Sequence, residues 1–195
     1  MDWGPEAEAI RCFEMAIPTF VGAEMFPTAA GLHKQIGDIY ERQDDKGNAL
    51  EHYHRVAEYF ALGNQPVSVV NALLKAAQLS AQLERYAEAL EIYERVVAMS
   101  MESTLLKLSA RDHFLNAGIC ALAMDDLSLV QRKMDRFWSL DPTFGSTRQG
   151  KFLEAMVQSF ANSSADDFGA VVLEPWKVAI LVKIKRNMSD PDVLS

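Results

Sequence analysis

The residues most able to do chemistry in this sequence form a glycine-rich stretch that ends in a lysine, Gly145 to Lys151. Its spacing fits G-x-x-x-x-G-K, a pattern in which backbone N–H groups and the lysine bind phosphate. The next residue is Phe152, where such a site needs a hydroxyl for Mg²⁺, and residues 138–144 contain a proline and an aspartate instead of a buried strand. The stretch therefore predicts a helix N-terminus with a solvated lysine, with nucleotide binding as the alternative.

The histidines and cysteines form no recognisable catalytic or metal-binding pattern. His52 and His54 are two residues apart on an expected helix, so they point to different faces. His113 has no nearby nucleophile with which to form a catalytic triad. Cys12 and Cys120 each lie in an amphipathic stretch with no partner at metal-ligand spacing. We therefore predict no catalytic residues, no metal and no cofactor, and we expect a protein that is not an enzyme.

The bulk properties favour an ordinary globular protein. The chain has 195 residues with 27 acidic and 19 basic side chains, and a net charge of −8. An excess of negative charge argues against general nucleic-acid binding, because phosphate contacts dominate that affinity. No apolar run approaches the roughly 20 residues that span a bilayer, and the first residues show no signal-peptide pattern. We expect a cytoplasmic protein with reduced cysteines.

Nearly the whole chain is predicted to be helical, and its helices repeat. In residues 71–111 apolar side chains recur near every 3.6 residues on both sides of a short polar joint at 84–86, which predicts an antiparallel helical hairpin. The second arm contains Ala-Leu-x-x-Tyr at 89–93, which matches residues 49–53 and, as Ala-Ile-x-x-Phe, residues 9–13. Three copies 40 residues apart predict stacked helical hairpins that bury their apolar faces on one another.

The predicted fold class is all-α, a TPR-like right-handed array of helical hairpins with repeats of about 40 residues, capped by a C-terminal helical bundle. The array is expected over residues 1–143 and the bundle, with an acidic tail, over 144–195. Helices are expected at 5–16, 27–42, 49–62, 71–83, 87–97, 104–124, 127–138, 146–160 and 175–187. Pro18 is expected to follow the end of the first helix.

A recurring set of basic residues is the main surface feature of the predicted array. An array of this kind presents one long face on which repeat proteins hold other proteins. These cations either form a positive stripe for an acidic, rod-like partner or lie scattered and solvated on both faces, and spacing alone leaves both alternatives open. The residues are Lys34, Arg55, Lys75, Arg95, Lys107 and Arg111.

Two long stretches resemble a known family. The hairpin Ala72 to Val96 and the following run Met101 to Asp126, with its Leu-Leu-Lys-x-Ser-Ala-Arg-Asp-His-Phe segment at 105–114, are similar to soluble NSF attachment proteins of the alpha/beta type. The resemblance extends from the first repeat copy to Trp176 and the acidic tail. It covers essentially the whole chain but only the C-terminal two-thirds of the family, so the N-terminal third with its membrane-touching loop is absent from the sequence.

The resemblance implies a function as an adaptor. Family members grip the assembled SNARE four-helix complex on a concave face and recruit the hexameric ATPase NSF through the C-terminal bundle, so that SNAREs are disassembled in vesicle-mediated and intracellular protein transport. It also implies a cytoplasmic protein that is peripherally membrane-associated through SNAREs alone. The alternative is a divergent or truncated scaffold of the same fold that has lost one partner and acts as a regulator or competitor.

The resemblance also assigns candidate binding residues. Lys75 matches a basic SNARE-facing position of the family, and Lys34 and Arg55 are expected to compensate for three basic family positions that fall here at Met25, Gly31 and Asn71. The candidate NSF-binding residues are Asp125, Asp190, Asp192 and Leu194.

Overall fold

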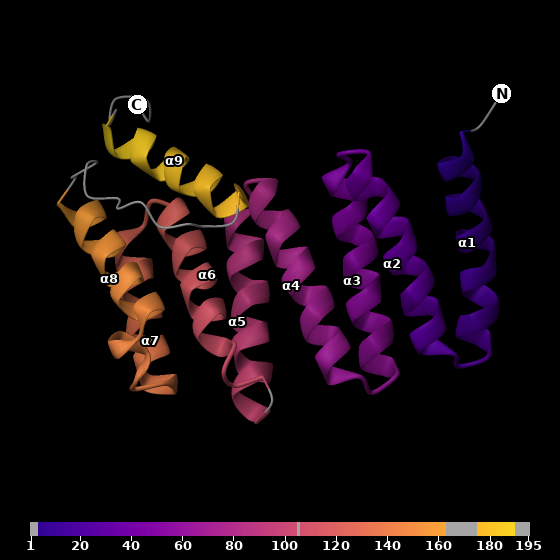
Figure 1. The fold of residues 1–195 in the computed structure, drawn as a ribbon, viewed down its shortest axis with the longest axis horizontal. Helices are drawn as coiled ribbons and strands as arrows, with labels where there is room; N and C mark the ends of the chain where they lie inside the picture. Colours follow the sequence, from indigo (N-terminus) through magenta and orange to yellow (C-terminus); the bar gives the residue numbers. More distant parts are fainter. Residues whose placement is uncertain (1–3, 105, 163–174, 190–195) are drawn as a thin grey trace. The chain divides into compact units, whose positions relative to one another are not determined.

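The computed structural model describes residues 4–104, 106–162 and 175–189, and over these residues the chain is helical without any strand (Figure 1). The all-α prediction is confirmed. The α-helices are α1 (Pro5–Gly22), α2 (Phe26–Arg42), α3 (Lys46–Leu62), α4 (Pro66–Gln82), α5 (Tyr86–Glu102), α6 (Ala110–Ala123), α7 (Leu127–Leu140), α8 (Arg148–Ala161) and α9 (Pro175–Ser189), and a short 3₁₀ turn, η1 (Phe144–Ser146), precedes α8. None of these described helices is long and apolar enough to cross a membrane.

The chain divides into two compact units, residues 1–83 and 84–195, and each is described by itself. The first contains α1 to α4 and the second contains α5 to α9. The predicted hairpin over residues 71–111 crosses this division, so the pairing of its two arms stays a prediction. The predicted separation into an array to residue 143 and a C-terminal bundle also stays a prediction.

The repeat is visible in the spacing of helices and joints. Each helix from α2 to α5 has 17 residues, and successive helices begin 20 residues apart. At each joint one residue adopts a left-handed backbone conformation; these residues are Glu24, Asp44, Asn64 and Glu84, with φ between 52° and 59°. In the joint after α2, the N–H of Asp45 donates to the carbonyl of Tyr40 and that of Asp44 to Glu41, at 2.9 and 3.0 Å. This pair of bonds is a Schellman motif, which satisfies the carbonyls at the helix end and reverses the chain.

The repeated apolar residues form the core of the first unit. Ala49 and Leu50 are buried, and Tyr53 lies beneath α2 with 4% of its surface exposed. A Cβ atom added to Gly37 would stand 3.2 Å from the Tyr53 ring, so glycine permits the close approach of α2 to α3. The equivalent residues of the first copy pack less completely: Ala9 and Phe13 are only partly buried, and α2 is the main neighbour of α1 within this unit.

In the second unit α6 is the central helix. It packs against α5, α7, α8 and α9, and most of its side chains are buried (Figure 1). Phe114 on α6 meets Phe137 on α7 and Phe144 of η1, with ring centroids 4.9 and 5.0 Å away. Gly118 faces Leu153 of α8 so closely that an added Cβ would stand 2.5 Å from the leucine. The aromatic cluster and this close contact together fix α6, α7 and α8.

Several predicted helix boundaries are wrong. The helix expected from residue 71 begins at Pro66, and the helix expected to end at residue 97 continues to Glu102. The first helix continues through Pro18 to Gly22. Pro18 removes one backbone hydrogen bond, but the packing of Ile17 and Val21 against α2 favours the continued helix. The helix expected from residue 104 begins at Ala110 instead. The preceding residues form turns in which Leu106 donates to the carbonyl of Ser103 and Ser109 donates to Leu106. Because α5 extends to Glu102, these turns are the joint between two helices.

Candidate functional site

The glycine-rich stretch at 145–151 is the capped start of α8. The side chain of Thr147 accepts a hydrogen bond from the N–H of Gly150 at 3.0 Å, which is an ordinary N-cap. A Cβ on Gly150 would stand 2.1 Å from the carbonyl oxygen of Phe144, so this glycine is required by backbone packing. Lys151 is exposed. A 3₁₀ turn precedes the stretch where a phosphate-binding loop follows a strand, so the structural context for nucleotide binding is missing here.

A histidine pair that sequence reasoning missed joins α2 to α3. The Nδ1 atoms of His33 and His52 are 3.0 Å apart, so one neutral ring donates to the other. Burial, followed by the neighbouring charges of His52 and Arg55, lowers the pKa of His33 to about 4. His33 occupies the repeat position that Leu73 occupies 40 residues later, and this position faces the neighbouring helix. The repeat therefore indicates that His33 contacts another helix. Across the described residues, no group of three or more His, Cys, Asp or Glu side chains is placed to hold a metal ion.

The first unit has a groove of about 490 Å³ between α2 and α4, with α3 as its floor. We call it the α2–α4 groove. Val56, Phe60 and Ala72 give it an apolar surface, and charged and polar groups lie along its two sides. The complete lining consists of Lys34, Asp38, Glu41, Tyr53, Val56, Phe60, Ser68, Asn71, Ala72 and Lys75. The groove therefore combines an apolar floor with cations and carboxylates at its edges.

The two lysines of the α2–α4 groove are paired with acids of the same groove. Lys75 Nζ on α4 lies 2.6 Å from Glu41 Oε1 on α2, so this ion pair crosses the groove. Lys34 Nζ lies 2.8 Å from Asp38 Oδ2 one helical turn later on α2. The Tyr53 hydroxyl also donates to Asp38. Two cations and two carboxylates leave these four ionised side chains without net charge.

Local hydrogen bonds keep the Asp38 carboxylate of the groove ionised. Burial acts to raise the pKa of Asp38, but the hydrogen bonds from Lys34 and Tyr53 outweigh it, and the pKa lies below its usual value. Burial, and then the bond to Asp38, raises the pKa of Tyr53. The Lys75 ammonium also lies 6.0 Å from the centroid of the Tyr53 ring, where its charge is attracted to the ring face. Tyr53 therefore organises both ion pairs.

The three predicted SNARE-facing residues do not all lie on one surface. Lys34 and Lys75 lie together in the α2–α4 groove. Arg55 is not among the residues that line the groove; it pairs with Glu58 at 2.9 Å and its charge acts on His33. The structure thus brings two of the three cations to one surface and leaves the third at the histidine pair.

Known proteins resemble the chain over almost its full length. A sequence model for the soluble NSF attachment protein, SNAP, matches residues 4–189. The alpha-soluble NSF attachment protein of Dictyostelium discoideum is 34% identical over 190 residues, which are 93% of this chain and 65% of that protein. The chain belongs to the soluble NSF attachment protein family.

Other SNAP-family relatives show similar coverage. The alpha-soluble NSF attachment protein of Mus musculus is 32% identical over 93% of this chain and 64% of its own length. A probable vesicular-fusion protein sec17 homolog of Schizosaccharomyces pombe is 31% identical over 95% of this chain and 68% of its own length. The chain thus spans about two thirds of the length of the curated relatives it matches. Members of this SNAP family are named for attachment and vesicular fusion, in agreement with the expectation that the chain is not an enzyme.

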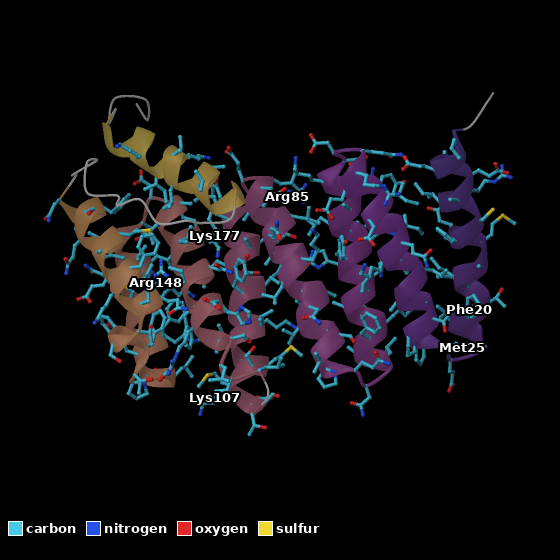
Figure 2. All side chains as sticks on the ribbon, viewed as in Figure 1. Phe20, Met25, Arg85, Lys107, Arg148 and Lys177 are labelled. Carbon is cyan, nitrogen blue, oxygen red and sulfur yellow. The ribbon has the colours of Figure 1, made fainter. Side chains whose placement is uncertain are left out.

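The three positions to which the family resemblance assigns basic residues, Met25, Gly31 and Asn71, separate in space. Asn71 lines the α2–α4 groove. Met25 lies at the joint between α1 and α2, near the end of both helices (Figure 2). Gly31 lies within α2 and is not among the residues that line the groove. Of these three residues, only Asn71 belongs to the groove.

The candidate NSF-binding residues of this SNAP-family chain are only partly described. Asp125 is exposed at the joint between α6 and α7 in a left-handed conformation, with φ of 60°. The next residue, Asp126, caps α7 by accepting a hydrogen bond from the N–H of Leu129 at 2.9 Å. Asp125 is therefore presented to solvent by the turn itself. Asp190, Asp192 and Leu194 lie outside the described residues.

Proposed function

We propose that this chain is a SNAP-type adaptor that binds assembled SNARE complexes through the α2–α4 groove and recruits an NSF-type hexameric ATPase for SNARE disassembly. Membership of the family supports a role in vesicle fusion and intracellular protein transport. The observation that carries the proposal is the shared position of Lys75 and Lys34 on one concave surface. We further propose a cytoplasmic location with peripheral membrane association through SNAREs.

A four-helix complex is a suitable occupant for such a groove. Its surface helices present side chains at i, i+3 and i+4, which can place apolar groups on Val56 and Phe60 and acidic groups beside the lysines. Charge complementarity of this kind acts at short range here and contributes mainly to orientation. The groove therefore selects a helical surface by shape first and by charge second.

The test of SNARE binding uses a purified, fully assembled SNARE complex and the full chain. Lys75→Glu is compared with Arg55→Glu, which makes the same charge change outside the groove. We expect Lys75→Glu to abolish binding at low salt and Arg55→Glu to change it less than about 3-fold, because an exposed ion pair contributes little. Equal losses of binding in both variants would mean that Arg55 also belongs to the binding surface. Absence of wild-type binding at low salt would contradict the proposal.

Recruitment of the ATPase has a separate test. The resemblance assigns Leu194 to this step, so Leu194→Ala is expected to weaken stimulation of NSF on SNARE-bound chain without changing helicity. Asp125→Asn addresses the exposed acid at the α6–α7 joint in the same assay. Unchanged ATPase stimulation in both variants would mean that neither residue takes part in recruitment.

A second function is suggested by the composition of the groove. Asn71 lies in the groove at a position to which the family resemblance assigns a basic residue. A SNAP-type scaffold that binds SNAREs without recruiting NSF would compete with full-length adaptors. In a SNARE disassembly assay with a full-length adaptor, added chain would then slow the reaction, whereas an active adaptor would not.

A further inference from the structure

We propose that Glu41 and Asp38 are specificity-determining residues that compete with an acidic helical partner for Lys75 and Lys34, and so set the affinity of the α2–α4 groove. The proposal deepens the function proposed above and rests on it for the identity of the natural partner. The partner chemistry to which it commits is an acidic, amphipathic helical surface.

The contact between Lys75 and Glu41 is the principal element of this competition. It joins opposite sides of the groove at 2.6 Å, and both side chains are about one-third exposed, at 30% and 34%. An ion pair between the walls differs from a pair along one helix, because it lies across the path of an entering side chain. A carboxylate that approaches Lys75 therefore meets the Glu41 carboxylate at close range, where partial burial reduces solvent screening.

The second ion pair, between Lys34 and Asp38, is held in place by the uncharged Tyr53 hydroxyl. Asp38 accepts hydrogen bonds from Lys34 and from the Tyr53 hydroxyl, and Tyr53 is itself buried beneath α2. Asp38 is thus fixed in the groove and cannot turn away when an acidic partner enters. Lys34 is more exposed than Lys75, at 55% of its side chain, so it can exchange partners more readily.

The charge of the surrounding unit provides no long-range attraction that could offset the competition from Glu41 and Asp38. Residues 1–83 contain 6 basic and 11 acidic side chains, so the unit that carries the groove is negative as a whole. Neither the groove nor its unit attracts an acidic surface from a distance. Affinity for an acidic helix must then come from short-range exchange of the ion pairs and from burial of apolar side chains on Val56, Phe60 and Ala72.

The decisive variant is Glu41→Gln, which keeps shape and hydrogen-bonding capacity but removes the competing charge. Its matched control is Glu58→Gln, which neutralises an acid paired with Arg55 outside the groove. Two probes are used with each full-length variant: the assembled SNARE complex and a synthetic glutamate-rich helical peptide. We expect Glu41→Gln to tighten binding of both probes about 3- to 10-fold at low salt, as for release of one partly buried ion pair.

Salt and a second variant sharpen the test. The gain from Glu41→Gln is expected to shrink at high salt, because it arises from a newly available charge. Asp38→Asn is expected to give a smaller gain, since it also weakens the bond from Tyr53. Circular dichroism and the melting temperature establish that every variant is folded.

The outcomes separate this proposal from the function on which it rests. Unchanged or weaker binding of the glutamate-rich peptide by Glu41→Gln would overturn the competition, and weaker binding would show that the ion pair preorganises Lys75. Failure of the SNARE complex to bind any variant, with the peptide still bound more tightly by Glu41→Gln, would remove the proposed function and keep the competition. Failure of both probes to bind would overturn both.

Discussion

At the scale of single residues, the His33–His52 contact couples the first unit to pH. Burial lowers the pKa of both rings, and His33 falls to about 4 in the folded chain against about 6.5 when unfolded. The unfolded chain therefore binds a proton between pH 6.5 and 4 that the folded chain does not. Stability is fully present above pH 6.5 and falls as the pH decreases toward 4. The charged groups that act on the pair are Arg55, Glu58, Glu51 and Glu14.

Replacing His33 by phenylalanine tests this coupling. His33→Phe keeps a ring against Tyr59, whose centroid is 5.4 Å away, but cannot take up a proton. The wild-type chain is expected to lose about 1–3 kcal/mol more stability than the variant between pH 7.5 and 4.5. Urea unfolding at several pH values measures the difference. Parallel curves for wild type and His33→Phe would show that the pair carries no proton linkage.

Glycines provide a second prediction at this scale. Gly150→Ala places a Cβ against the carbonyl of Phe144, which cannot move without displacing η1, so we expect a loss of about 2–3 kcal/mol. Gly31→Ala meets nothing within 4 Å inside α2 and is expected to stabilise by about 0.5–1 kcal/mol. Urea unfolding of both variants measures the opposite signs. A tolerated Gly150→Ala would mean that the start of α8 can be rebuilt.

At the scale of elements, the joints between helices carry a regular backbone cost. Glu24 adopts φ of 57°, which strains a side chain with a Cβ but not glycine. Glu24→Gly is therefore expected to be neutral or stabilising by about 0.5 kcal/mol. Ala23→Gly in the same joint, at φ of −91°, is expected to destabilise by about 0.5–1 kcal/mol. Thermal unfolding of the two variants would contradict this explanation if both lost stability equally.

The placement of α9 depends on one lysine. Lys183 donates to Glu84 and lies 5.0 Å from the centroid of the Tyr86 ring, while Ile180 and Ile184 of the same helix are buried. Lys183→Met keeps the apolar stem but removes the charge, so we expect local opening of α9 to become easier by about 1 kcal/mol.

Hydrogen exchange of α9 amides measures this opening. The control is Lys151→Met, a change of the same kind at an exposed position of α8. Similar exchange in both variants would mean that the apolar contacts alone hold α9 to its unit.

At the scale of the whole molecule, negative charge is distributed over both units. Residues 1–83 carry 6 basic and 11 acidic side chains, and residues 84–195 carry 13 and 16. Because phosphate neutralisation supplies most non-specific nucleic-acid affinity, the excess of acidic side chains in both units disfavours such binding. Fluorescence anisotropy with labelled duplex DNA and RNA at about 0.15 M salt is expected to show no binding. Binding with a steep salt dependence would reveal a local basic surface.

Repeated residues were the part of the molecule most accessible from the sequence. Ala49, Leu50 and Tyr53 were recognised as one repeat copy and are buried as such, because helical periodicity and size already specify a packed face. Lys75 and Lys34 were selected through the family resemblance and lie in one groove. The sequence did not indicate that Glu41 pairs with Lys75. The two residues are 34 positions apart in the chain, and only the packing of the helices brings their side chains to 2.6 Å.

The sequence by itself determined the all-α class, the repeated apolar residues 40 positions apart, and membership of the SNAP family, since these depend on local periodicity and on residue types along the chain. Only the tertiary structure decided which cations share a surface, which acids neutralise them and that His33 meets His52. A charge is attracted to whatever lies near it in space, and the packing of α2, α3 and α4 sets those distances.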